Sequence, residues 1–153
     1  MATKKKSVKA KPKKKKSAPK KKVVKTKVTN SPFQKVASGQ PNWFGLSTTD
    51  GQAAANFYGK VLGHSQEKMT MGNETMIMLK AGGNQIAHID SVEPGASPRW
   101  IIYFYVPDVD KAVKLCADNG GQIVMPPGDI PPGRIAFLKD PAGAEFALFK
   151  PRG

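Results

Sequence analysis

The segment WIIYFYVPDVDKAVKLCADNGG, residues 100–121, decides how this chain folds. Its first seven residues are aromatic or aliphatic and end at a proline, which indicates a strand. Asp108 follows at a position where helix N-caps are preferred. The residues at helical spacing after it are apolar: Val109, Ala112, Val113 and Cys116. A glycine pair at 120–121 supplies the stop, so the segment predicts a strand followed by an amphipathic helix.

The same arrangement occurs 58 residues earlier in the chain. The matching pairs are Trp43 with Ile101, Asp50 with Asp108, Ala54 with Ala112, and Gly63 with Gly121. We therefore expect a strand over 43–49 and a helix between Asp50 and Gly63. The apolar face predicted for this helix consists of Ala53, Ala54, Phe57, Tyr58, Val61 and Leu62.

Three short strands are predicted after each helix. They cover 69–71, 76–79 and 85–89 in the first half, and 122–125, 134–138 and 145–149 in the second. The fold class is thus α+β, with two βαβββ units. One unit is too small to bury its sheet well, so we expect the two to pair, with curved sheets around a cup. The proline-rich stretch 125–133 is expected to be a stiff loop, either at the rim of the cup or as a plain connection.

The excess charge of the chain lies at its N-terminus. Of 25 basic residues, fourteen are lysines within residues 1–28, a stretch that contains no acid, and the remaining eleven balance the eleven acids that follow. Fourteen like charges with almost no apolar surface cannot offset the entropy of ordering. We therefore predict a disordered lysine-rich tail over 1–30, a linker over 31–40 and a folded domain over 41–153.

Lysine is a compact charge that suits phosphate groups, so the tail is predicted to bind nucleic acid without sequence preference. Its texture resembles the tails of linker histones and bacterial histone-like proteins. The candidate lysines are Lys4, Lys5, Lys6, Lys13, Lys14, Lys15, Lys16, Lys20, Lys21 and Lys22. Anionic lipid, ribosomal RNA, a nuclear address and a merely solubilising role stay open as alternatives. Because we find no signal peptide or membrane span, we expect a cytoplasmic protein, with nucleoid or nuclear association left open.

Four stretches carry a resemblance to a known family: DGQAAANFYGKVLG (50–63), VPDVDKA (106–112), the glycine pair at 120–121 and GRIAFLKDPAGA (133–144). Over about residues 41–150 the chain resembles the vicinal oxygen chelate superfamily of glyoxalase I, extradiol dioxygenases and bleomycin-resistance proteins. It is most similar to the tandem glyoxalase-like branch. The resemblance implies a cup between paired units, built within one chain or across a dimer, and we expect a homodimer.

The resemblance also implies a divalent metal, and the usual ligand positions can be tested. They fall here on Trp43 and Ile101 in the first strand of each unit, and on Ala87 and Ala147 in the last. None of these side chains donates a lone pair to a metal. We therefore predict no metal and no cofactor.

Four other side chains of types that bind metals lie elsewhere in the sequence and could replace the usual ligands: His64, His88, Glu145 and Cys116. His64 is expected to be solvated after the first helix. His88 is expected on the face opposite to Ala87, as a packing residue or, if the register slips, as a residue of the cup or a metal ligand. Glu145 shares the predicted face of Ala147, and Cys116 fits a small buried position rather than a nucleophile.

Strand alternation predicts the lining of the cup. The expected residues are Trp43, Ser47, Gln85, Tyr103, Tyr105, Arg134 and Glu145. Three functions follow as hypotheses. One is a metal-independent domain that binds a partly apolar small molecule, with the tail on nucleic acid. Another is a glyoxalase-like lyase or hydroxylase whose metal ligands are displaced. In the third, the tail is the functional part and the domain is a dimerising scaffold. We favour binding over catalysis, because no nucleophile with a base and no catalytic carboxylate pair is evident.

Overall fold

A computed structural model describes residues 36–71, 74–92 and 94–152 of the chain. The elements are β1 (Pro41–Thr48), α1 (Gly51–Leu62), β2 (Ser65–Met71), β3 (Glu74–Ala81), β4 (Asn84–Ser91), β5 (Arg99–Tyr105), α2 (Val109–Asp118), β6 (Gln122–Ile130), β7 (Gly133–Lys139) and β8 (Glu145–Pro151). This order is βαβββ twice, so the predicted α+β class and the duplicated unit are confirmed.

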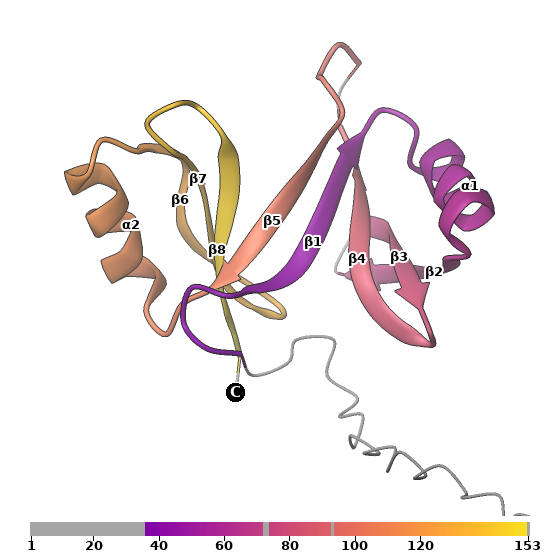
Figure 1. The fold of residues 1–153 in the computed structure, drawn as a ribbon, viewed down its shortest axis with the longest axis horizontal. Helices are drawn as coiled ribbons and strands as arrows, with labels where there is room; N and C mark the ends of the chain where they lie inside the picture. The colour runs from indigo at the N-terminus through magenta and orange to yellow at the C-terminus, as the bar shows by residue number, and fades with distance from the viewer. Residues whose placement is uncertain (1–35, 72–73, 93, 153) are drawn as a thin grey trace, which may run out of the picture.

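The two units join at their first strands into one mixed sheet, with the order β2-β3-β4-β1-β5-β8-β7-β6. β1 and β5 run antiparallel down its centre, while α1 and α2 lie at opposite ends of the molecule (Figure 1). Trp43 pairs with Tyr103, and Gly45 pairs with Ile101. Since residues 43 and 45 match 101 and 103 in the repeat, this central pair has an approximate two-fold relation.

The core has three clusters. One lies between α1 and its sheet, around Leu46, Ala55 and Leu79. A second lies between α2 and its sheet, around Val113 and Leu138. The third contains residues of both units, with Trp43, Met78, Ile101, Tyr103, Ile135, Ala147 and Phe149. Because strand residues alternate between faces, this third cluster lies on the side of the sheet away from the helices.

Both helices begin at the predicted caps. Asp50 accepts a hydrogen bond from the backbone N–H of Ala53 at 2.8 Å, and Asp108 accepts one from that of Lys111 at 3.0 Å. α1 ends at Gly63, whose φ of 72° is the left-handed conformation that glycine adopts without strain. The apolar face predicted for α2 is confirmed, since all four of its residues lie in or against the core cluster.

The apolar face predicted for α1 is only partly correct, since Ala54 and Tyr58 pack against the core cluster. Phe57, Val61 and Leu62 are 57–59 % exposed, whereas Gly51 and Ala55 are buried. Small residues allow α1 to lie close to the sheet: an added Cβ on Gly51 would lie 3.3 Å from the Ile89 side chain. Those three larger residues therefore point away from the contact.

The proline-rich stretch is largely strand rather than loop. β6 continues through Pro126 and Pro127 to Ile130, with register shifts between Met125 and Gly128. β6 is the edge strand of the sheet, where a missing N–H costs no ladder hydrogen bond. The tail predicted over 1–30 and the first half of the linker, 31–35, lie outside the described residues. Among the residues described, no helix is long and apolar enough to cross a membrane.

Candidate functional site

A cavity of about 330 Å³ opens between the two units. Its lining is contributed by both: Trp43, Met76, Met78, His88, Asp90, Tyr103, Met125, Ile130, Pro131, Pro132, Ile135, Phe137 and Phe149. Most of these side chains are apolar, and several are aromatic. The size and the lining are typical of a site for a small organic molecule. Ile130, Pro131 and Pro132 belong to this lining, so the end of the proline-rich stretch lies at the cavity, in agreement with the interpretation that it borders the cup.

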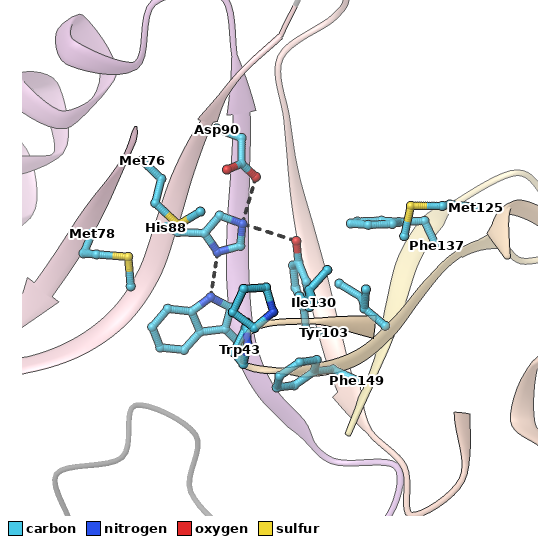
Figure 2. Close-up of a pocket in the computed structure, with 13 residues that line it drawn as sticks. Trp43, Met76, Met78, His88, Asp90, Tyr103, Met125, Ile130, Phe137 and Phe149 are labelled. Atoms are coloured by element: carbon cyan, nitrogen blue, oxygen red, sulfur yellow. Dashed lines mark hydrogen bonds and ion pairs between the residues drawn. The ribbon is translucent and has the colours of Figure 1, made fainter. Parts of the chain in front are cut away.

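The polar groups of the cavity meet in one corner, which consists of Trp43, His88, Asp90 and Tyr103 (Figure 2). Trp43 donates from Nε1 to His88 Nδ1 at 2.7 Å. His88 Nε2 lies 2.8 Å from Asp90 Oδ2 and 3.3 Å from the Tyr103 hydroxyl oxygen. The indole and imidazole rings are nearly parallel, with centroids 6.2 Å apart. This corner is the only part of the described lining that offers polar side chains.

The proton positions in the corner follow from donor and acceptor chemistry. An indole N–H can only donate, so His88 Nδ1 must accept and carries no proton while this bond exists. The ring proton then lies on Nε2, where the Asp90 carboxylate accepts it. Tyr103 can only accept from that nitrogen, so its own hydroxyl proton is not used by His88. The imidazole is neutral in this arrangement.

Gly45 makes the corner sterically accessible. An added Cβ at this position would lie 2.9 Å from His88 Cε1 and 3.0 Å from Tyr103 Cε2, closer than real Cβ contacts. The glycine on the central strand therefore allows the imidazole and the phenol to meet above it.

The Tyr103 hydroxyl is held in its neutral form. Burial raises the pKa of Tyr103 well above its usual value, and the negative charge of Asp90 raises that pKa further. Tyr103 is only 5 % exposed, and its ring also packs edge-on against Phe137, with centroids 5.9 Å apart. At neutral pH it therefore presents a neutral O–H to the cavity.

Of the residues predicted to line the cup, Trp43 and Tyr103 do so. Ser47 is buried further along β1, and Tyr105 is half-buried at the end of β5. Neither belongs to the lining. Gln85 precedes an irregularity in the β3–β4 pairing, and it is also outside the lining.

The two charged residues predicted for the cup form ion pairs elsewhere. Arg134 donates to both carboxylate oxygens of Asp110 on α2 at 2.7 Å, and this hydrogen bonding lowers the pKa of Asp110. On β7, alternation gives the cavity face to Ile135 and Phe137, so Arg134 lies on the helix side. Glu145, at the start of β8, pairs with Arg99 and Lys139.

His88 is the site residue that the sequence placed on the wrong face. Leu79 pairs with Ala87 and Lys80 pairs with Gln85, which leaves Ile86 as an extra residue and shifts the alternation. Ala87 consequently packs under α1, and His88 points into the cavity. In the structure Gly45 pairs with His88 and Tyr103 with Ala147, so the last strands of the two units match at a spacing of 59 rather than the 58 seen at the first strands and helices.

His64 and Cys116 lie outside the cavity. His64 is half-buried and stacks on the Tyr58 ring, so it is less solvated than expected. Cys116 packs against the α2 cluster, with its sulfur 3.9 Å from the Lys139 carbonyl oxygen, in agreement with a small buried residue.

Comparison with known proteins identifies the family. The profile of the Glyoxalase/Bleomycin resistance protein/Dioxygenase superfamily matches residues 40–148. The chain belongs to this superfamily. Over 119 residues it is 37 % identical to a protein of Mycobacterium tuberculosis named "Putative glyoxylase CFP32", covering 73 % of this chain and 46 % of the relative.

Another relative is the anthracycline biosynthesis protein DnrV of Streptomyces peucetius, which is 29 % identical over 133 residues, covering 76 % of this chain and 48 % of DnrV. The chain thus spans about half the length of the curated relatives it matches. Among solved structures, methylmalonyl-CoA epimerases share the fold at 18 % identity. The Streptomyces coelicolor enzyme gives a TM-score of 0.55 over 76 % of this chain and all of that chain. The Mycobacterium tuberculosis enzyme gives 0.53, over 78 % and 94 %.

The donor set of the cavity can be compared with the metal centre that the superfamily resemblance implies. In the described parts of the chain, no three His, Cys, Asp or Glu side chains come together. The cavity has His88 and Asp90, and both ring nitrogens of His88 already have hydrogen-bond partners. Trp43, Ile101 and Ala147, at three of the four implied positions, supply no donor atom. This pair is smaller than the three or four protein ligands with which zinc sites are built.

Proposed function

We propose that this chain is a small-molecule-binding domain of the glyoxalase superfamily, which holds a flat, partly apolar ligand between its two units without a metal ion. The observation that supports this most strongly is the cavity itself: an apolar lining on several sides with its polar groups gathered in one corner. Aromatic walls and a few fixed polar groups are what ligand sites use for affinity and orientation.

The arrangement of His88 favours binding over proton-transfer chemistry. A general base needs a nitrogen lone pair that a substrate can reach, and Nδ1 already accepts the Trp43 N–H. His88 therefore serves to hold Asp90 and Tyr103 in place. The competing proposal is a metal-dependent glyoxalase-like lyase or hydroxylase with displaced ligands, which the glyoxylase name of the mycobacterial relative supports.

The methionines give a direct test of the binding proposal. Met76, Met78 and Met125 line the cavity, whereas Met69 does not. In the full chain with ¹³C-labelled methionine methyl groups, titration with 2-(1-naphthyl)ethanol should shift the three cavity signals more than that of Met69, which packs against the same cluster without lining the cavity. A titration that moves none of the three, or that moves Met69 the most, would contradict a ligand in this cavity. Stoichiometric Zn, Ni, Fe or Mn in the purified protein would support the competing enzyme.

We propose in addition that the lysine-rich segment 1–28 associates with nucleic acid. The observation that supports this is the charge distribution: all of the net charge of +14 belongs to these residues. Binding through phosphates releases counterions and falls steeply with salt. In fluorescence anisotropy with duplex DNA, the wild type should bind at low salt with little sequence preference. A variant with the ten candidate lysines changed to glutamine keeps four of the fourteen and should bind much more weakly. An unchanged affinity of that variant for DNA would contradict the proposal.

A further inference from the structure

We infer that the cavity selects a positively charged ligand, a flat apolar molecule with a protonated amine that is bound by Asp90. This inference rests on the proposed function and adds the chemical class of the ligand. It comes from the charge of the described lining, in which Asp90 is the one acidic side chain and to which no lysine or arginine contributes.

The charge of Asp90 is not neutralised within the described part of the protein. His88 Nε2 lies 2.8 Å from its carboxylate, and none of the described lysines and arginines lies within ion-pair distance of it. The hydrogen bond from Trp43 keeps His88 in the neutral form, so His88 donates a hydrogen bond to Asp90 without cancelling its charge. A carboxylate has about four acceptor positions, and His88 uses one of them.

Asp90 is accessible to a ligand in the cavity. Its side chain is 42 % exposed, whereas that of His88 is 12 % exposed. Figure 2 shows its carboxylate above the imidazole and the indole, at one end of the polar corner. An ammonium group would replace water around this carboxylate and form a charge-assisted hydrogen bond.

The neighbouring aromatic rings favour the same ligand. The faces of Trp43 and Tyr103 attract cations through the quadrupole of the ring. Tyr103 is a neutral phenol at neutral pH, as tyrosine ordinarily is, and burial and Asp90 raise its pKa further, so Asp90 is the anionic group of the corner. Met76, Met78 and Phe137 supply adaptable apolar contacts for the body of the ligand.

Three probes of matched shape test this selectivity in the full chain: 2-(1-naphthyl)ethylamine, 2-(1-naphthyl)ethanol and 1-naphthylacetate. Dissociation constants are measured at 150 mM salt from the methyl signals of Met76, Met78 and Met125. Because these signals report on the cavity, binding of the anion to the lysine-rich tail does not enter the measured constants. We expect the amine to bind about three- to tenfold more tightly than the alcohol, since water screens part of the charge at a half-exposed carboxylate. The anion should bind most weakly.

Asp90→Asn should remove the preference for the amine, so that the amine and the alcohol bind with similar affinity. The matched control is Asp118→Asn, which removes the same charge on α2, where Asp118 pairs with Lys114. If the Asp90→Asn variant does not fold, the wild-type preference is measured from 50 to 500 mM salt, and it should fall as salt rises.

The outcomes separate the two proposals. Equal binding of amine and alcohol by the wild type, or a preference that survives Asp90→Asn or is independent of salt, would overturn the charge selectivity while the cavity remains a binding site. Binding of none of the three probes would overturn both.

Discussion

The two βαβββ units share a topology but have different roles at the cavity. The first unit supplies Trp43, His88 and Asp90, which is most of the polar corner. The second supplies Tyr103 and an apolar wall that includes Ile135, Phe137 and Phe149. At the equivalent position of the last strand, the first unit has a half-buried His88 and the second a fully buried Ala147.

This difference shows how a duplicated fold makes an asymmetric site. The central strands β1 and β5 keep the two-fold pairing of the backbone, so both units present the same strand positions to the cavity. The residue type at each of these positions then decides which unit supplies hydrogen-bonding groups to the cavity and which unit supplies apolar wall. A ligand with a polar end and an apolar body would lie in one orientation across such a cavity.

The largest effect is expected from matched truncations in the two helix-covered cores. Leu79 on β3 and Leu138 on β7 are each 0 % exposed, in equivalent positions of the two units. Each change to alanine should lower the free energy of unfolding by about 2–5 kcal/mol, through lost burial and the cavity left behind. Because one sheet joins the units, urea denaturation followed by circular dichroism should show a single transition for both variants.

Leu115→Ala is the control for this pair, since Leu115 is 53 % exposed on α2 and should change the stability by no more than about 0.5 kcal/mol. Two separate transitions, with only one of them shifted by each variant, would show that the units unfold independently.

A smaller effect is expected where the two units meet. Gly45→Ala places a Cβ against the rings of His88 and Tyr103, and should cost about 1–3 kcal/mol of stability as those rings are displaced. The Trp43–His88 hydrogen bond should weaken, which the indole N–H signal in proton NMR would report. Gly128→Ala on β6 is the control, because its Cβ would meet no atom closer than 4.0 Å. Equal effects of the two changes would contradict the close packing around Gly45.

The dependence of stability on alkaline pH tests whether Tyr103, which the second unit supplies to the polar corner, is buried. The unfolded chain loses the Tyr103 proton near the ordinary tyrosine pKa of about 10, whereas the folded chain retains it to higher pH. The folded state therefore binds more protons above that pH, and its stability should fall by up to about 1.4 kcal/mol per pH unit. Urea denaturation from pH 9 to 11 should show this loss for the wild type and for Tyr105→Phe. Tyr103→Phe should show clearly less, and an unchanged slope would argue against a buried phenol.

The smallest change in the free energy of unfolding is expected for an exposed residue of α1, and a comparison with α2 shows how the two helices differ in their buried faces. Phe57→Ala on α1 removes a side chain that is 57 % exposed, and should change the free energy of unfolding by no more than about 0.5 kcal/mol. Val113→Ala on α2 removes fewer atoms from a side chain that is 5 % exposed, yet should cost about 1.5–2 kcal/mol. Thermal melts of both variants would check the order, which would be reversed if the sequence-predicted face of α1 were buried.

The fold was predictable because its signals are local and occur twice. Asp50 and Asp108 cap their helices as the sequence indicated, and the repeat located the strands on either side. The buried face of α1 was not predictable from the helical spacing of its apolar residues, because small and large apolar residues each recur at that spacing on different faces of this helix. There, close approach through Gly51 and Ala55 takes precedence over the size of Phe57.

The site was only partly predictable, since it depends on register between strands that are distant in sequence. Trp43 and Tyr103 lie on regular strands, so alternation placed them correctly in the cavity lining. The extra residue at Ile86 changes the face of everything after it on β4, and no composition signal marks such a bulge. Asp90 was missed for a different reason: the predicted strand ended at residue 89, whereas β4 continues to Ser91. The nucleic-acid role of the tail and the homodimer stay predictions.

The contact between Trp43 and His88 gives the protein a built-in optical reporter. The chain has two tryptophans, and the other, Trp100, is 41 % exposed and donates to the Tyr58 hydroxyl far from the cavity. Replacing Trp100 by phenylalanine would leave a single indole at the cavity wall. The emission of that indole would then follow entry of a ligand without any added dye.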